Sequence, residues 1–157
     1  MRAARKLLVA RFLCIIHLMQ NPIWKFESDL TNRLLIWSIL SILSGLYIWF
    51  ATNEFGQGFG IQAVVWGFID AAIAVASART AARRKSTADP MREALFIRKV
   101  LWINFGLDVL YILGGAWVLL NYTNVFWRGT GWGIVLQGTF LFFFDLFHAI
   151  KIPVELK

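Results

Sequence analysis

The sequence predicts an all-α fold, a bundle of four antiparallel transmembrane helices preceded by an N-terminal amphipathic helix at the membrane interface. Of its 157 residues, 59% are hydrophobic, compared with roughly 45–50% in soluble domains, and the mean hydropathy is +0.63. Four apolar stretches approach the ~20 residues that a helix needs to cross a bilayer. The 8 Trp and 14 Phe residues belong to a class enriched at membrane interfaces. We expect one transmembrane domain over 26–157, with spans at about 34–51, 60–78, 100–120 and 131–150.

The first 25 residues begin like a signal peptide, with three basic residues followed by a short apolar run. Arg11 and His17 interrupt that run, however, and no small-residue cleavage site follows it. We therefore expect residues 1–25 to form a basic helix on the cytoplasmic leaflet. The alternative is an extension without a structural role.

The first span, 34–51, contains no charged residue. Ser28 or Asp29 is a suitable N-cap, so we expect the helix to begin near them. Small residues share one face of this span, which favours tight helix packing in lipid. They are Ser38, Ser41 and Gly45.

The second span, 60–78, carries a stripe of small residues that includes Gly67 and a neighbouring polar stripe that includes Asp70. The following connection, 79–99, holds seven basic residues against Asp89 and Glu93. This excess of positive charge predicts that the connection and both termini are cytoplasmic. Its densest basic segment is the candidate for binding anionic lipid headgroups. That segment is Arg83, Arg84 and Lys85.

The third span, 100–120, has a polar stripe at its centre. Asn104, Asp108 and Tyr111 follow the i, i+4, i+7 spacing of one helix face. An ionised carboxylate at this depth costs roughly 2.5–3.5 kcal/mol on insertion scales. The stripe is therefore either a path or site for protons, cations or a small ligand, or an interhelical hydrogen-bond network that sets helix register.

The fourth span, 131–150, places Gln137, Leu141, Asp145 and His148 near one face. Asp145 and His148 have the i, i+3 spacing of some metal ligand pairs, but protein metal sites usually need three or more ligands. We therefore expect no metal, and we expect His148 to be bonded to Asp145 near the interface. The single cysteine, Cys14, excludes an intrachain disulfide and a cysteine-based metal site.

The acids of the last three spans are expected at similar depth. With a rise of about 1.5 Å per residue, Asp70 lies near the midplane, Asp108 about 3 Å and Asp145 about 6 Å toward the cytoplasm. Because lipid exposure would be costly, we predict that all three converge on one shielded pocket. No Lys or Arg lies inside a predicted span, so we expect at least one of the three to be protonated at neutral pH.

The two halves of the chain resemble each other weakly. Gly60 and Gly67 have the same spacing as Gly131 and Gly138, although the acids do not superpose. A parallel duplication of a two-helix unit is one interpretation.

Several motifs resemble a family of uncharacterised bacterial four-helix integral membrane proteins. They are N-x2-LD-x2-Y-x2-GG over 104–115, G-x-G over 131–133, QG at 137–138 and FL-x3-D over 140–145. The resemblance covers about 66–148 and implies that the polar stripe is a family feature, but it brings no assigned activity. The small four-helix drug exporters match less well, because their essential acid is in the first helix and the first span here has none.

Two classes of function remain. The first is a non-catalytic accessory subunit, or a module that binds lipid or a small ligand, and we favour it because no span is broken by proline at mid-depth. The second is a proton-coupled transporter or channel that uses the three acids. We expect no enzyme activity, no cofactor and no nucleic-acid partner, since the positive charge flanks the spans. The expected partners are membrane lipids and, in the cytoplasmic (inner) membrane, further copies of the chain or subunits of a larger complex.

Overall fold

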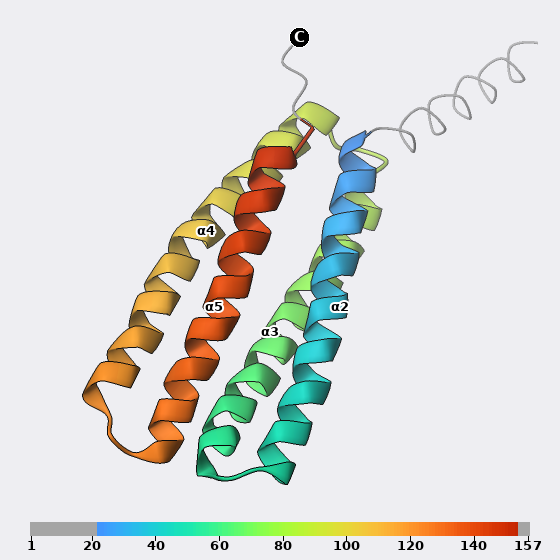
Figure 1. The fold of residues 1–157 in the computed structure, drawn as a ribbon. Coiled ribbons are helices and arrows are strands. Elements are labelled where there is room, and N and C mark those ends of the chain that lie inside the picture. Colours follow the sequence, from blue (N-terminus) through green and yellow to red (C-terminus); the bar gives the residue numbers. More distant parts are fainter. Residues whose placement is uncertain (1–21, 154–157) are drawn as a thin grey trace, which may run out of the picture.

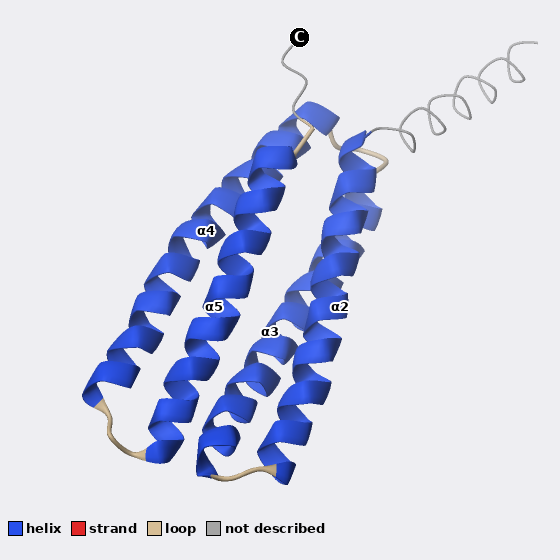
Figure 2. Cartoon of the chain, in the orientation of Figure 1, coloured by secondary structure: helices blue, strands red, loops and turns tan. Residues whose placement is uncertain are grey.

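Four long helices form an antiparallel bundle in the computed structural model, which describes residues 22–153 (Figure 1). They are α2 (Pro22–Ala51), α3 (Glu54–Arg84), α4 (Pro90–Asn121) and α5 (Val125–Lys151). This part of the chain contains no strand (Figure 2). Each helix is long and apolar enough to cross a membrane. The predicted all-α four-helix fold is confirmed, whereas residues 1–21 of the predicted interfacial helix lie outside the described residues.

The helix starts follow from local chemistry, with one correction. Asn53, Asp89 and Asn124 cap α3, α4 and α5, each accepting a hydrogen bond from a backbone N–H of the first turn. The start of α2 was predicted near Ser28 or Asp29 and that prediction is wrong, because the helix already includes Pro22. Proline suits a first helical turn, where its missing N–H would have no partner in any case.

The helices do not all pack in chain order. Close backbone packing joins α2 to α3, α4 to α5, and α3 to α5. Figure 1 accordingly shows α3 and α5 in the middle, flanked by α2 and α4. Short connections favour side-by-side packing of consecutive helices, but α3 and α4 make few close backbone contacts. The chain is therefore two helical hairpins joined through their second helices.

Glycines permit the close approach of the two central helices. A Cβ atom on Gly58 of α3 would collide with the backbone carbonyl of Phe126 on α5. In the reverse direction, a Cβ on Gly129 of α5 would collide with the carbonyl of Phe55 on α3. This reciprocal pair lies at the end of the bundle where the two hairpins turn.

The hairpins also repeat each other. One common spacing separates Asn53 from Asn124, Gly58 from Gly129 and Gly67 from Gly138. The packing partners match as well, since a Cβ on Gly67 would meet Ile42 at 2.7 Å and one on Gly138 would meet Ile112 at 2.9 Å. The two halves are thus related by a pseudo-two-fold axis that runs along the bundle, in agreement with the weak repeat in the sequence.

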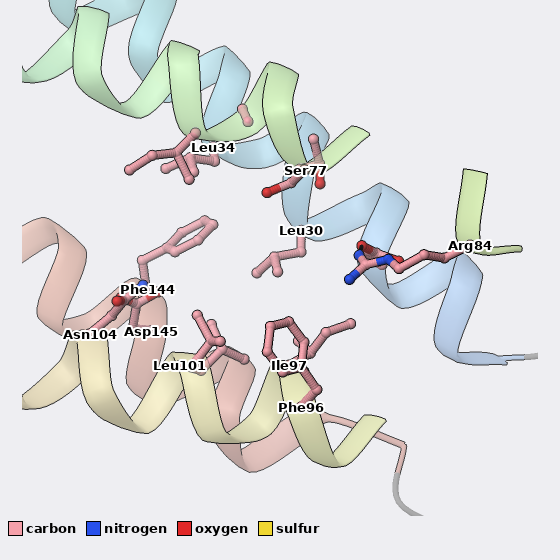
Figure 3. Close-up of a pocket in the computed structure, with 15 residues that line it drawn as sticks. Leu30, Leu34, Ser77, Arg84, Phe96, Ile97, Leu101, Asn104, Phe144 and Asp145 are labelled. Carbon is pink, nitrogen blue, oxygen red and sulfur yellow. Dashed lines mark hydrogen bonds and ion pairs between the residues drawn. The ribbon is translucent and has the colours of Figure 1, made fainter. Parts of the chain in front are cut away.

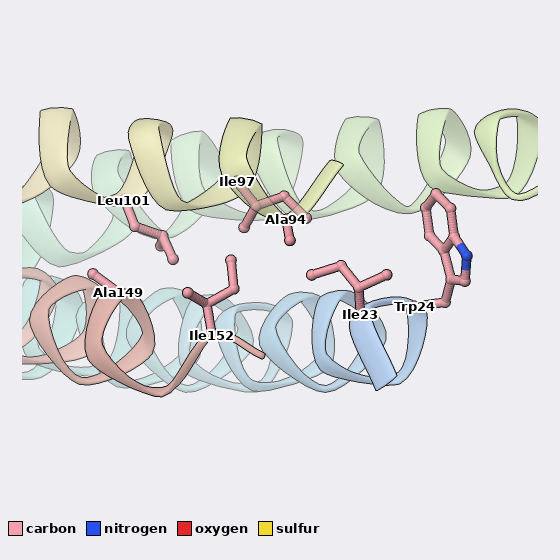
Figure 4. Close-up of a cluster of buried hydrophobic side chains, with 7 residues drawn as sticks. All are labelled: Ile23, Trp24, Ala94, Ile97, Leu101, Ala149 and Ile152. Carbon is pink, nitrogen blue, oxygen red and sulfur yellow. The ribbon is translucent and has the colours of Figure 1, made fainter. Parts of the chain in front are cut away.

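The opposite end of the bundle is closed by apolar packing (Figure 4). Buried side chains from α2, α4, α5 and the residue after α5 form one cluster there. They are Ile23, Trp24, Ala94, Ile97, Leu101, Ala149 and Ile152. This cluster joins the two hairpins at the end where the basic connection lies.

Candidate functional site

A cavity of about 520 Å³ brings together the three acids of the predicted spans. Asp70 of α3, Asp108 of α4 and Asp145 of α5 all line it, and they are only 2%, 7% and 6% exposed. The cavity lies between α3 and α4, the two consecutive helices that make few close contacts. Space for the site remains because α3 and α4 are not closely packed against each other.

The three carboxyl groups form one electrostatic cluster. Asn104 and Asp108 both lie beside the carboxyl group of Asp145, and Asp70 interacts with the other two acids through space. Within residues 22–153, the Oδ2 atoms of Asp70 and Asp108 are buried and have no hydrogen-bond partner. No Lys or Arg is among the described residues that line the cavity. A buried polar atom without a partner is costly, so these two oxygens are the natural attachment points for a donor group.

The wall of the cavity on the side of the two hairpin turns is aromatic. Tyr111 contacts Trp66 edge to face, with ring centroids 4.5 Å apart, and its hydroxyl donates to Gln62 Oε1 at 3.4 Å. The rim is apolar, because Leu107 and Leu110 line the cavity while 56% and 64% exposed. In a bundle that spans a membrane, this rim faces acyl chains.

A second, smaller cavity of about 130 Å³ continues toward the end of the bundle that holds the basic connection. It shares Leu34, Ile73, Asn104 and Asp145 with the first cavity and reaches Arg84. Figure 3 shows Asn104 and Asp145 at one end and Arg84 at the other. The acid cluster is therefore not sealed by close packing on that side.

Arg84 closes that end through two ion pairs. Its guanidinium lies 2.9 Å from Glu27 of α2 and 3.0 Å from Glu93 of α4, and both carboxylates are buried. Of the three predicted headgroup-binding residues, Arg83 and Lys85 are exposed, whereas Arg84 serves this link between three helices. Sequence reasoning counted Glu93 only in the charge balance of the connection and did not consider Glu27.

Gln137 and His148 do not join the acid cluster. Gln137 accepts a hydrogen bond from Trp37 Nε1 at 3.2 Å and donates to Ser41 Oγ at 3.4 Å, both on α2. His148 Nδ1 lies 2.6 Å from the carbonyl oxygen of Phe144, and its Nε2 lies 3.3 Å from Arg33. The expected bond from His148 to Asp145 is therefore wrong.

Helix geometry explains this division of the α5 polar residues. Successive residues turn by about 100°, so Asp145 lies about 80° around the helix from Gln137, whereas His148 lies only about 20° from it. Gln137 and His148 consequently face α2, and Leu141 and Asp145 face the cavity.

The α2–α5 groove is the pseudo-symmetric counterpart of the α3–α4 groove, and it is filled. Trp37 stacks on Phe140 with centroids 3.5 Å apart, and Trp37 also donates to Gln137. One groove is thus packed with aromatic and amide groups, while the other is hollow and acidic.

Residues 33–146 match a family described as a family of unknown function, DUF6992. The chain belongs to this family. The DUF6992 region includes Asp70, Asp108 and Asp145 and stops before His148. No curated protein and no solved structure matches the chain.

A metal site usually needs three or more ligating side chains grouped around one ion. In the range 22–153, no three His, Cys, Asp or Glu side chains are grouped so that they could hold one ion. The cavity offers a cluster of three carboxyl groups, an aromatic wall and an apolar rim.

Proposed function

We propose that this multi-pass membrane protein is a non-catalytic binding module that takes up a lipophilic ammonium ion in the α3–α4 cavity. The observation that carries the proposal is the pair of buried Oδ2 atoms of Asp70 and Asp108 without hydrogen-bond partners, in a cavity whose described lining holds no Lys or Arg. An ammonium group would donate to these oxygens.

The walls match the remainder of such a ligand. Ring faces of Trp and Tyr attract organic cations, and Trp66 and Tyr111 lie at the cavity wall. The exposed Leu107 and Leu110 at the rim offer contact to an alkyl chain and a way in from the bilayer. The volume of about 520 Å³ is within the usual range for small-ligand sites, roughly 300–1,000 Å³.

The test is calorimetric titration of the purified protein with n-octylamine, using the uncharged n-octanol as the matched probe. Losing a hydrogen bond to a charged group costs about 1.5–3 kcal/mol, so octanol should bind roughly 10- to 100-fold more weakly. Asp70→Asn and Asp108→Asn should weaken octylamine binding by a similar factor, because the amide keeps the shape of the carboxylate but lacks its charge.

Glu54→Gln is the control variant, since Glu54 is an exposed acid at the far end of α3. Its affinity for octylamine should equal that of the unmodified protein. Equal binding of the amine and the alcohol, or unchanged affinity in both aspartate variants, would remove the proposal.

A proton-coupled transporter is the second candidate, and the continuation of the cavity toward Arg84 favours it. A carrier must open its site to water, whereas a binding module fed from the bilayer does not need to. Leu141→Cys, placed in the cavity wall of a Cys14→Ser protein, distinguishes the two. Rapid reaction with a charged, membrane-impermeant thiol reagent supports transport, and no reaction in folded protein supports the binding module.

We further propose that the termini are cytoplasmic and that the chain assembles in the inner membrane of a bacterium, as a homo-oligomer or as an accessory subunit. The basic residues around the α3–α4 connection support this orientation. The exposed apolar side chains on all four helices provide surface for lipid or for neighbouring subunits.

A further inference from the structure

We infer that the α2–α5 groove ends in a binding site for the phosphate of an anionic phospholipid, formed by Arg33, His148 and Lys151. This site is independent of the acidic cavity, since it lies in the other groove of the pseudo-symmetric bundle. It also differs from the 83–85 segment that the sequence predicted, because Arg84 of that segment is held by Glu27 and Glu93.

The geometry places two cations around one histidine. The Arg33 guanidinium is 3.3 Å from His148 Nε2, and the imidazole Nδ1 lies 2.6 Å from the Phe144 carbonyl oxygen. With Nδ1–H donating to that carbonyl, Nε2 is free to accept from Arg33 and fixes the guanidinium in place. Lys151 also interacts electrostatically with His148, and its Nζ lies 4.0 Å from the centre of the Phe147 ring.

Neither Arg33 nor Lys151 forms an ion pair with the part of the protein that is described. Between residues 22 and 153, the carboxylates that form ion pairs are Glu27, Glu93 and Asp89, and none of them pairs with Arg33 or Lys151. A guanidinium and an ammonium group that both lie near His148 match the oxygens of a phosphodiester.

The surroundings favour a lipid over a free phosphate. Ile36, one turn along α2 from Arg33, and Phe147 and Ile150 on α5 are large apolar side chains exposed on the surface. His148 is in the last turn of α5, at the same end of the bundle as the basic connection (Figure 1). A headgroup bound by Arg33 and Lys151 would therefore leave its acyl chains beside apolar side chains.

Native mass spectrometry of detergent-purified protein tests this site with phosphatidylglycerol and phosphatidylcholine of identical acyl chains. A basic side chain contributes roughly a fivefold gain in affinity for an anionic lipid, so Arg33→Gln with Lys151→Gln should lower retention of phosphatidylglycerol roughly thirtyfold. Retention of phosphatidylcholine should be low in both proteins. Arg33→Lys, which keeps the charge, should stay within about fivefold of the unmodified protein.

The matched control removes two exposed charges at the same end of the bundle, Arg83→Gln with Lys85→Gln, and should retain phosphatidylglycerol normally. Equal losses in both double variants, or a loss in the control alone, would overturn the inference. Displacement of the lipid by millimolar inorganic phosphate would assign the site to free phosphate and overturn it as well. Thermal melting of each variant shows whether a loss of lipid reflects unfolding, and Arg33→Lys then decides the result.

Discussion

The buried carboxylates of this protein lie in two different electrostatic environments. Glu27 and Glu93 both form ion pairs with one guanidinium, that of Arg84. Asp70, Asp108 and Asp145 share a cavity without Lys or Arg among the described residues that line it. The first arrangement links α2, α3 and α4, and the second leaves hydrogen-bonding capacity for something that enters the cavity. We therefore expect stability to depend on Glu27 and Glu93, and the proposed binding to depend on the three aspartates.

Replacing Arg84 with Gln should destabilise the protein by about 2–3 kcal/mol, because it leaves two buried carboxylates without their cation. This is below the roughly 3–5 kcal/mol for fully buried pairs, since the Arg84 side chain is 33% exposed. Reversible unfolding in mixed micelles measures the change in free energy. The neighbouring Arg83→Gln should cost less than about 0.5 kcal/mol, and an equal effect of the two substitutions would show that the ion pairs carry no stability.

At the residue scale, the sequence identified the acids but not all their partners. The positions of Asp70, Asp108 and Asp145 could be inferred because lipid exposure of a carboxylate is so costly that all three must face inward. The partners of Gln137 and His148 could not be inferred in this way. A small difference in angular position around α5 decides whether a side chain faces α2 or the cavity. The link from Glu27 to Arg84 depends on tertiary packing, which no local pattern encodes.

The helices of this bundle approach one another most closely at glycines, which have no side chain. Gly58 and Gly129 lie against the backbone of the opposite central helix. Gly106 and Gly114 of α4, by contrast, have no neighbouring atom within 4 Å of the position that a Cβ would occupy. The same residue type therefore has different consequences on different helix faces.

Gly129→Ala should separate α3 from α5 and destabilise the bundle by about 1–3 kcal/mol, the usual range for overpacking, because backbone atoms cannot rotate away. Gly106→Ala and Gly114→Ala should be neutral or stabilising by up to about 1 kcal/mol through helix propensity. Thermal melting of the three variants in one detergent compares them directly. If all three alanines had the same effect, close packing at Gly129 would not be what holds the central pair.

The sequence predicted four helices of the right type, but α2 begins earlier than predicted and the other three helices extend beyond the predicted spans. Uninterrupted apolar stretches determine where helices can cross a membrane, since every backbone polar group must be bonded within the span. The start of α2 was missed because a proline can either end a helix or begin one, and the preceding Asn21-Pro22 pair favoured a break.

On the scale of the whole molecule, the order of packing was the least predictable feature. Short connections make α2–α3 and α4–α5 neighbours, as expected. The longer connection 85–89 does not specify whether α3 packs against α4 or against α5. The close contacts at Gly58 and Gly129 favour packing of α3 against α5. The repeated glycine spacing was the available signal in the sequence, but it showed a similarity of halves and not which helices face each other.

Separately expressed hairpins should reassemble. Residues 1–87 and 88–157, produced together in one membrane, should purify as a one-to-one complex, because each hairpin packs internally and the α3–α5 contact needs no covalent link. Affinity purification through a tag on one fragment measures this. Gly129→Leu in the second fragment is the control that should abolish recovery, and failure of the unmodified fragments to associate while each remains folded would contradict the two-hairpin description.

The pseudo-two-fold arrangement also limits stoichiometry. Two identical hairpins would form two identical grooves, and therefore two equivalent ligand-binding sites in each pair of hairpins. Here the hairpins differ, so one groove is plugged by the Trp37–Phe140 stack and the other stays open around the aspartates. An amine should therefore saturate the protein at one molecule per chain, however many copies assemble.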